Sequence, residues 1–275
     1  LAASGHRPDA TWPARVILIV ISAVIVWTVI AAQRGKKLFI RRIPGLTAID
    51  EAVGRAVEMG RGILLSSGLG GIDVVTLQAL AICTNIASAA ARYGTKVQMP
   101  IYEAALLPIA EDAISSAYNK AGRSDAFSSD DVRYLSNQQF AYAAGVAGMI
   151  QREQYAATFL FGTFFAESLI MAENANMVGA IQVAGTPSTT QIPFFIASCD
   201  YVIIGDEYYA ATAYLTRQPT LLGSMIGQDR VKIGILVTVM LGFLLTMAKM
   251  PLVKNLFEDK DMPAASYYSP AKGGK

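Results

Sequence analysis

The chain has 275 residues, of which 53% are hydrophobic and 16% are charged, and its formal net charge is +2. Nucleic-acid binding needs a basic stripe, and the chain has one short basic run, so no nucleic-acid partner is expected. The one histidine, His6, lies in the N-terminal tail. Its position excludes most zinc sites, His-based triads and haem ligation from the rest of the chain.

Two uncharged apolar runs stand near the ends of the chain, at residues 16–32 and 233–248. A helix needs about 20 apolar residues to cross a bilayer, with roughly 17 as the lower limit. We therefore predict transmembrane helices over residues 16–33 and 231–250, an N-terminal tail over 1–15 and a C-terminal tail over 251–275. A cleaved signal peptide is the alternative interpretation of the first run.

A basic cluster follows the first run and consists of Arg34, Lys36, Lys37, Arg41 and Arg42. Lys and Arg beside a span stay on the cytoplasmic side of the membrane. Residues 34–230 are therefore predicted to form a cytoplasmic domain, with both termini outside. The same side chains suit contact with anionic head groups, so the cluster is assigned to the membrane surface.

Helical segments and short apolar strands alternate between the two runs. Thr47 is predicted to cap the first helix, Pro108 to kink the third, and Gly60, Gly94 and Gly122 to end the first three. In chain order, the predicted helices cover residues 47–60, 73–94, 102–121, 138–151, 166–177, 189–199 and 208–216. The predicted strands cover residues 62–66, 95–99, 131–135, 156–161, 180–184 and 201–204.

The strands are continuous apolar runs, and no hairpin turn joins two of them in the sequence. Such strands are typical of a parallel sheet that is buried on both faces by helices. The fold class is therefore predicted as α/β: one doubly wound, mostly parallel sheet in a Rossmann-like domain, flanked by two transmembrane helices. Cys83 and Cys199 lie in apolar segments and are predicted to be buried thiols.

Ligands of such sheets bind beyond the carboxyl ends of the strands. The candidate ligand-binding residues at these ends are Ser67, Gly68, Gly70, Gly71, Thr186, Glu167 and Glu207. The glycine-rich turn after the first strand matches neither G-x-G-x-x-G nor a Walker loop. It is interpreted either as a structural turn or as an anion-binding loop. The two glutamates are interpreted as helix caps or, alternatively, as acid/base groups.

Several phrases along the chain resemble a membrane-anchored bacterial family catalogued as domain of unknown function 6754. These phrases lie at residues 40–69, 138–154, 165–173, 179–186 and 199–215. The resemblance implies the bacterial inner, or cytoplasmic, membrane as location. The family carries no activity from which catalytic residues follow.

The leading hypothesis is a non-catalytic, oligomeric membrane protein that acts as a scaffold or accessory subunit of a larger membrane complex. It names the lipid bilayer, further copies of the chain and other subunits as partners, and it needs no cofactor, metal or catalytic residue. Gly234 and Gly242 are expected to allow close helix contact. The alternatives are a membrane-anchored sensory domain for a nucleotide or other anion, and an enzyme centred on Glu167 and Glu207.

Overall fold

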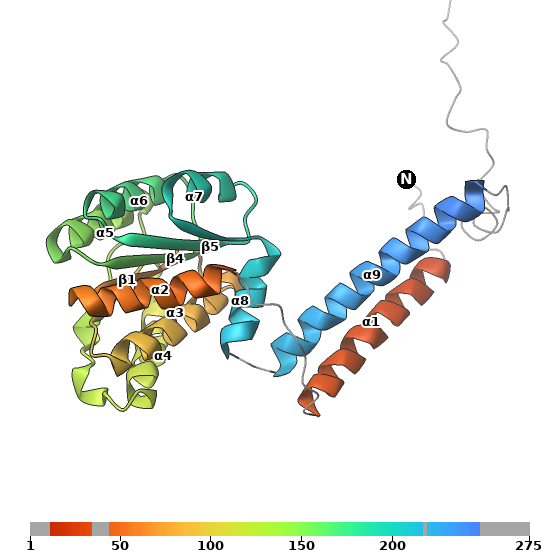
Figure 1. Ribbon diagram of the computed structural model, residues 1–275, viewed down its shortest axis with the longest axis horizontal. Coiled ribbons are helices and arrows are strands. Elements are labelled where there is room, and N and C mark those ends of the chain that lie inside the picture. Colours follow the sequence, from red (N-terminus) through yellow and green to blue (C-terminus); the bar gives the residue numbers. More distant parts are fainter. Residues whose placement is uncertain (1–11, 35–43, 217–218, 248–275) are drawn as a thin grey trace, which may run out of the picture. The chain divides into compact units, whose positions relative to one another are not determined.

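The computed structural model describes residues 12–34, 44–216 and 219–247. The chain divides into two units. One unit holds helices α1 (Trp12–Gln33) and α9 (Pro219–Met247), and the other, within Phe39–Gln218, is an α/β domain (Figure 1).

Strands and helices alternate through the α/β domain. Its strands are β1 (Ile63–Gly68), β2 (Val97–Ile101), β3 (Val132–Tyr134), β4 (Ala157–Thr163), β5 (Ile181–Thr186) and β6 (Tyr201–Ile204). Its helices are α2 (Pro44–Met59), α3 (Val74–Arg92), α4 (Leu107–Lys120), α5 (Gln139–Glu153), α6 (Glu167–Met177), α7 (Ile192–Ser198) and α8 (Asp206–Thr216). Each predicted strand and helix of this region therefore has its counterpart.

The strands form one six-stranded sheet in the order β3-β2-β1-β4-β5-β6. The paired strands run parallel throughout this sheet. This is the order of the doubly wound Rossmann sheet, whose direction of winding reverses between the first and fourth strands. The predicted fold class is thus confirmed, and the reversal point lies between β1 and β4.

Helices cover both faces of the sheet (Figure 1). One face packs with α2, α3, α4 and α8 into a core that contains Ile63, Leu65 and Phe159. The other packs with α5, α6 and α7 into a core that contains Leu64 and Leu160. Neighbouring residues of β1 and β4 thus enter opposite cores, which is why these strands read as continuous apolar runs.

Two details of the predicted helices were wrong. Helix α2 begins at Pro44, so Thr47 lies inside it and does not cap it. Pro108 is the second residue of α4 and fits its first turn without a kink, because proline there lacks only an N–H that the helix would leave unpaired. The predicted helix ends at Gly60, Gly94 and Gly122 are confirmed, since all three have positive φ just after α2, α3 and α4.

Two described helices are long and apolar enough to cross a membrane, Arg15–Gln33 in α1 and Val74–Arg92, which is α3. The second was not expected from the sequence. Half of α3 is buried inside the α/β domain, whereas only 11% of the α1 window is buried. The apolar composition of α3 is therefore that of a core helix. Burial inside the described structure does not explain the apolar composition of α1.

Asp73 caps α3, as the first residue of the predicted helix suggested: its Oδ1 accepts the backbone N–H of Thr76 at 2.7 Å. Loss of an N-cap side chain costs about 1 kcal/mol. Asp73→Ala is expected to lower the free energy of unfolding by this amount, measured by urea titration of the full chain in detergent with far-UV circular dichroism. Asp73→Asn is the control, because Asn caps equally well. Equal losses in both variants would contradict the cap.

Candidate functional site

The carboxyl ends of β1 and β4 contact each other directly at the point where the winding reverses. Gly68 has φ +78°, and a Cβ added there would lie 2.9 Å from the backbone nitrogen of Thr163. Gly162 has φ +119°, and its added Cβ would lie 3.0 Å from the carbonyl carbon of Ser67. Leu69 N–H also donates to Thr163 O at 2.8 Å. Only glycine fits both the positive φ and the narrow space at these positions. The close packing of β1 against β4 therefore explains why residue 68 is a glycine.

The rest of the glycine-rich turn surrounds the N-terminus of α3. A Cβ at Gly70 would collide with Thr76 Oγ1, and Gly71 is exposed. In a dinucleotide-binding fold this helix end holds the pyrophosphate. Here the Asp73 carboxylate already accepts a helix N–H, and its charge would repel a phosphate. The geometry therefore favours the structural interpretation of this turn over an anion-binding loop.

Two buried hydroxyls beside this turn lack partners. Among the described residues, Ser67 Oγ and Thr76 Oγ1 have no hydrogen bond, and both side chains are almost fully buried. Thr186, at the end of β5, is different, because its Oγ1 accepts the Ser188 N–H at 3.2 Å. The predicted ligand-binding residues of β1 and β5 thus lie at one edge of the sheet, but the hydroxyl of Ser67 is unpaired and that of Thr186 stabilises the turn after β5.

Glu167 is fully buried, and hydrogen bonds occupy both of its carboxylate oxygens. Oε1 accepts the N–H of Phe165 at 2.7 Å, and Oε2 accepts Nε2 of Gln139 at 2.6 Å. The side chain therefore joins the first turns of α5 and α6. This agrees with the interpretation of Glu167 as a structural group at a helix start.

Glu207 does not join Glu167. It is exposed in the first turn of α8, whose Tyr208 packs in one core, whereas Met171 of α6 packs in the other. Across the described part of the chain, His, Cys, Asp and Glu side chains form no group of three that could hold a metal ion. The arrangement offers no pair of carboxylates for acid/base work at this edge.

A polar hollow of about 220 Å³ lies at the C-terminal half of α3, between α2, α3 and α8. Asp50, Asn85, Ser88 and Arg92 contribute its polar groups. Small-molecule sites usually measure about 300–1,000 Å³. The hollow is below that range, and we assign it no ligand.

The unit of α1 and α9 contains a close helix contact that the sequence interpretation missed. Gly223 and Gly227 of α9 face α1, where an added Cβ would lie 2.7 Å from Val29 Cα and 3.2 Å from Ile25 Cα, respectively. This spacing is GxxxG, which lets two helix backbones approach closely. The sequence predicts this role for Gly234 instead, but no described atom comes within 4 Å of its added Cβ.

The two helices run antiparallel, since Gly223 lies against Val29 whereas Val239 lines the same groove as Val16. Arg230 of α9 stacks on Trp27 of α1, with Cζ 5.9 Å from the ring centre. Trp27 lies in the C-terminal half of the apolar run of α1, and Arg230 directly precedes the predicted span at 231–250. Residues 219–230, which the sequence interpretation grouped with the central domain, thus form the first turns of α9.

The basic cluster falls mainly outside the described residues. Arg34 follows the last residue of α1 directly, and Lys36, Lys37, Arg41 and Arg42 lie in the range that the structure does not describe. Their assignment to a membrane surface stays a prediction.

The family model described as domain of unknown function DUF6754 matches residues 8–257. The chain belongs to the DUF6754 family. No curated protein and no solved structure matches the chain.

The DUF6754 match extends over both units, from before α1 to beyond the described end of α9. The helix pair is therefore part of the family pattern together with the α/β domain. An account of DUF6754 function must include α1 and α9.

Of the two cysteines of this DUF6754 chain, Cys83 is buried as predicted, whereas Cys199 is only partly buried. Burial raises the pKa of Cys83 to about 12 and that of Cys199 to about 11. Since the thiolate is the reactive form, neither cysteine is expected to react with a maleimide at pH 7.5 within minutes. Mass spectrometry should show no adduct on the native chain and two adducts after unfolding in guanidinium. Fast labelling of native Cys83 would contradict its buried position.

Overpacking at the helix contact tests the role of the glycines. Gly223→Leu or Gly227→Leu forces a side chain against the α1 backbone, a change that typically costs about 1–3 kcal/mol. Both variants are expected to lose their monodisperse elution from detergent at a lower temperature than the unsubstituted chain. Gly234→Leu, in the same helix but in open space, should elute unchanged. Equal thermal sensitivity of all three would refute the close contact.

Proposed function

We propose that the chain is a non-catalytic membrane subunit, in which α1 and α9 insert into a lipid bilayer and the α/β domain docks other protein chains. The observation that carries this proposal is the large apolar surface of the helix pair. Leu18 of α1 is 66% exposed and Leu236 of α9 is 65% exposed. Many neighbours share this exposure, namely Ile17, Ile19, Val20, Val26, Ile233, Val237, Val239, Leu241, Phe243 and Leu244.

Water is a poor solvent for this surface. Burying a Leu, Ile, Val or Phe side chain is worth about 1.5–3 kcal/mol relative to its exposure. For a dozen such side chains on two helices, the summed free-energy cost of exposure to water exceeds the whole stability of an ordinary domain, which is about 5–15 kcal/mol. Lipid or protein must therefore cover these side chains, and a bilayer suits helices whose backbone hydrogen bonds are satisfied internally.

The α/β domain supports a subunit role more than a catalytic one. Both oxygens of Glu167 hold helix ends, and Asp73 occupies the helix end that would bind phosphate. Beside the Gln139–Glu167 hydrogen bond, Phe140 and Phe165 are exposed. Exposed aromatic residues of this size mark protein contact surfaces. These features support docking to further copies of the chain or to other subunits of a membrane complex.

The proposed topology places the α/β domain in the cytoplasm of a bacterium. The support is the sequence position of the basic cluster, which begins at Arg34 directly after α1. Lys and Arg beside a span remain on the cytoplasmic side. Protease added outside whole cells should leave the α/β domain intact, and its digestion there would overturn the topology.

Membrane insertion is tested by carbonate extraction and by flotation with lipid vesicles. The chain is expected to remain in the carbonate pellet and to float. Leu18→Asp with Leu236→Asp should release a substantial fraction, because a charge at a helix centre in a bilayer costs about 2.5–3.5 kcal/mol. Ser129→Asp is the matched control, since Ser129 is exposed on the α/β domain. Full release of the unsubstituted chain by carbonate would end the proposal.

A further inference from the structure

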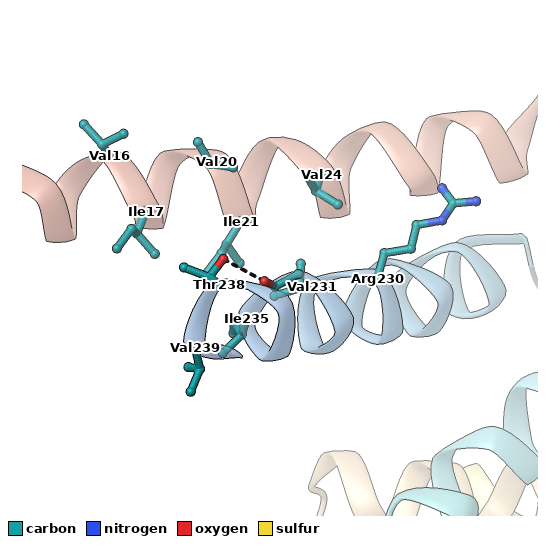
Figure 2. A pocket seen from close by; sticks show the side chains of 11 residues that line it. Val16, Ile17, Val20, Ile21, Val24, Arg230, Val231, Ile235, Thr238 and Val239 are labelled. Carbon is teal, nitrogen blue, oxygen red and sulfur yellow. Dashed lines mark hydrogen bonds between the residues drawn. The ribbon is translucent and has the colours of Figure 1, made fainter. Parts of the chain in front are cut away.

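An apolar groove of about 540 Å³ lies between α1 and α9 (Figure 2). Val16, Val20 and Val24 line it from α1, and Val231, Ile235 and Val239 line it from α9. In Figure 2, Ile21 of α1 and Val231 of α9 lie in the space between the two helices. The groove comes next along α9 after the glycine contact, since its lining on α9 begins at Arg230.

One polar group on the groove wall is already satisfied. The Thr238 hydroxyl donates to the carbonyl oxygen of Gly234 at 2.8 Å, shown by the dashed line in Figure 2. Because this hydroxyl already donates a hydrogen bond within its own helix, it needs no hydrogen-bond partner from a ligand. The wall between Val16 and Val231 therefore behaves as hydrocarbon.

The remaining polar group of the lining is a cation at one end. Arg230 lines the groove together with Val24, and its guanidinium stacks on the Trp27 ring. Within residues 12–34, 44–216 and 219–247, Arg230 contacts this ring and forms no ion pair with a carboxylate. A guanidinium held by a ring face keeps its N–H donors available for a planar or tetrahedral anion.

We propose that the groove holds one acyl chain of an anionic phospholipid, whose phosphate binds Arg230. The proposal rests on the membrane insertion proposed above. The cation is complementary to a phosphate, which guanidinium groups bind through paired, charge-assisted hydrogen bonds. The apolar wall is complementary to the acyl chain that follows.

The test measures, by native mass spectrometry, which lipids remain bound to the full chain after its release from nanodiscs. The nanodiscs contain phosphatidylcholine alone or an equal mixture of phosphatidylcholine and phosphatidylglycerol. The unsubstituted chain is expected to retain one phosphatidylglycerol molecule. Arg230→Gln should lower that retention roughly tenfold, the effect of losing one charge-assisted contact. Val20→Trp should lower it too by filling the groove.

Two controls keep the outcomes separate. Lys232→Gln removes a cation from the same helix outside the groove lining and should retain the lipid, whereas Arg230→Lys should keep the preference for phosphatidylglycerol. Retention by Arg230→Gln equal to that of the unsubstituted chain would overturn the proposal. So would equal retention of phosphatidylcholine, or equal losses in Arg230→Gln and Lys232→Gln, which would indicate general attraction to an anionic surface.

Vesicle flotation of every variant precedes the lipid measurement and separates this proposal from the proposed function. If the unsubstituted chain does not float, both proposals fall. If it floats and Arg230→Gln still retains phosphatidylglycerol, only the lipid site falls. A mass of two chains without lipid in the groove would also overturn the lipid site, because it would assign the groove to a second copy.

Discussion

The apolar surface of the α1–α9 pair is the constraint on which the account of this chain depends. The exposed Leu, Ile, Val and Phe side chains of the two helices cannot be hidden between the helices, because each helix carries them on several sides. The pair is held by a backbone contact at Gly223 and Gly227, which uses small residues instead of apolar burial. This is the type of helix packing expected where the solvent is as apolar as the side chains.

In the α/β domain, side chains and backbone of the chain itself make contacts at the edge where Rossmann-order sheets bind ligands. In dinucleotide-binding members of this fold class, the reversal point between the first and fourth strands receives the cofactor. Here Gly68 contacts Thr163 across the strand ends, and the carboxylates of Asp73 and Glu167 accept backbone N–H groups at the starts of α3 and α6. One backbone N–H group at the start of each of these helices is thus already paired within the chain.

Much of this fold was predictable from local sequence patterns. Continuous apolar strands gave the parallel sheet, and positive-φ glycines ended three helices where expected. Strand order was not predictable, since it depends on contacts between distant segments. The prediction that Thr47 caps a helix was wrong, because the cap-like pattern at Thr47 lies inside a helix that starts at Pro44.

The candidate site was harder to predict than the fold. The glycine-rich turn suggested a ligand, but packing against Thr163 explains its first glycine, which no local pattern reveals. The pair Gly223 and Gly227 was visible in the sequence with the GxxxG spacing. The charges of Asp229, Arg230 and Lys232 separate this pair from the apolar run at 233–248, so the run alone does not point to it. The contact between Arg230 and Trp27 follows from the register of two helices far apart in sequence.

The most direct test of this account is the solvent met by Leu18 and Leu236 when the chain is reconstituted in liposomes. A nitroxide attached after Leu18→Cys or Leu236→Cys substitution reports collisions with oxygen, which concentrates in lipid, and with a nickel chelate, which stays in water. The account predicts that oxygen collisions dominate at both positions. Dominant nickel collisions at both would show that water or an aqueous cavity covers the helix pair, and would contradict the central claim.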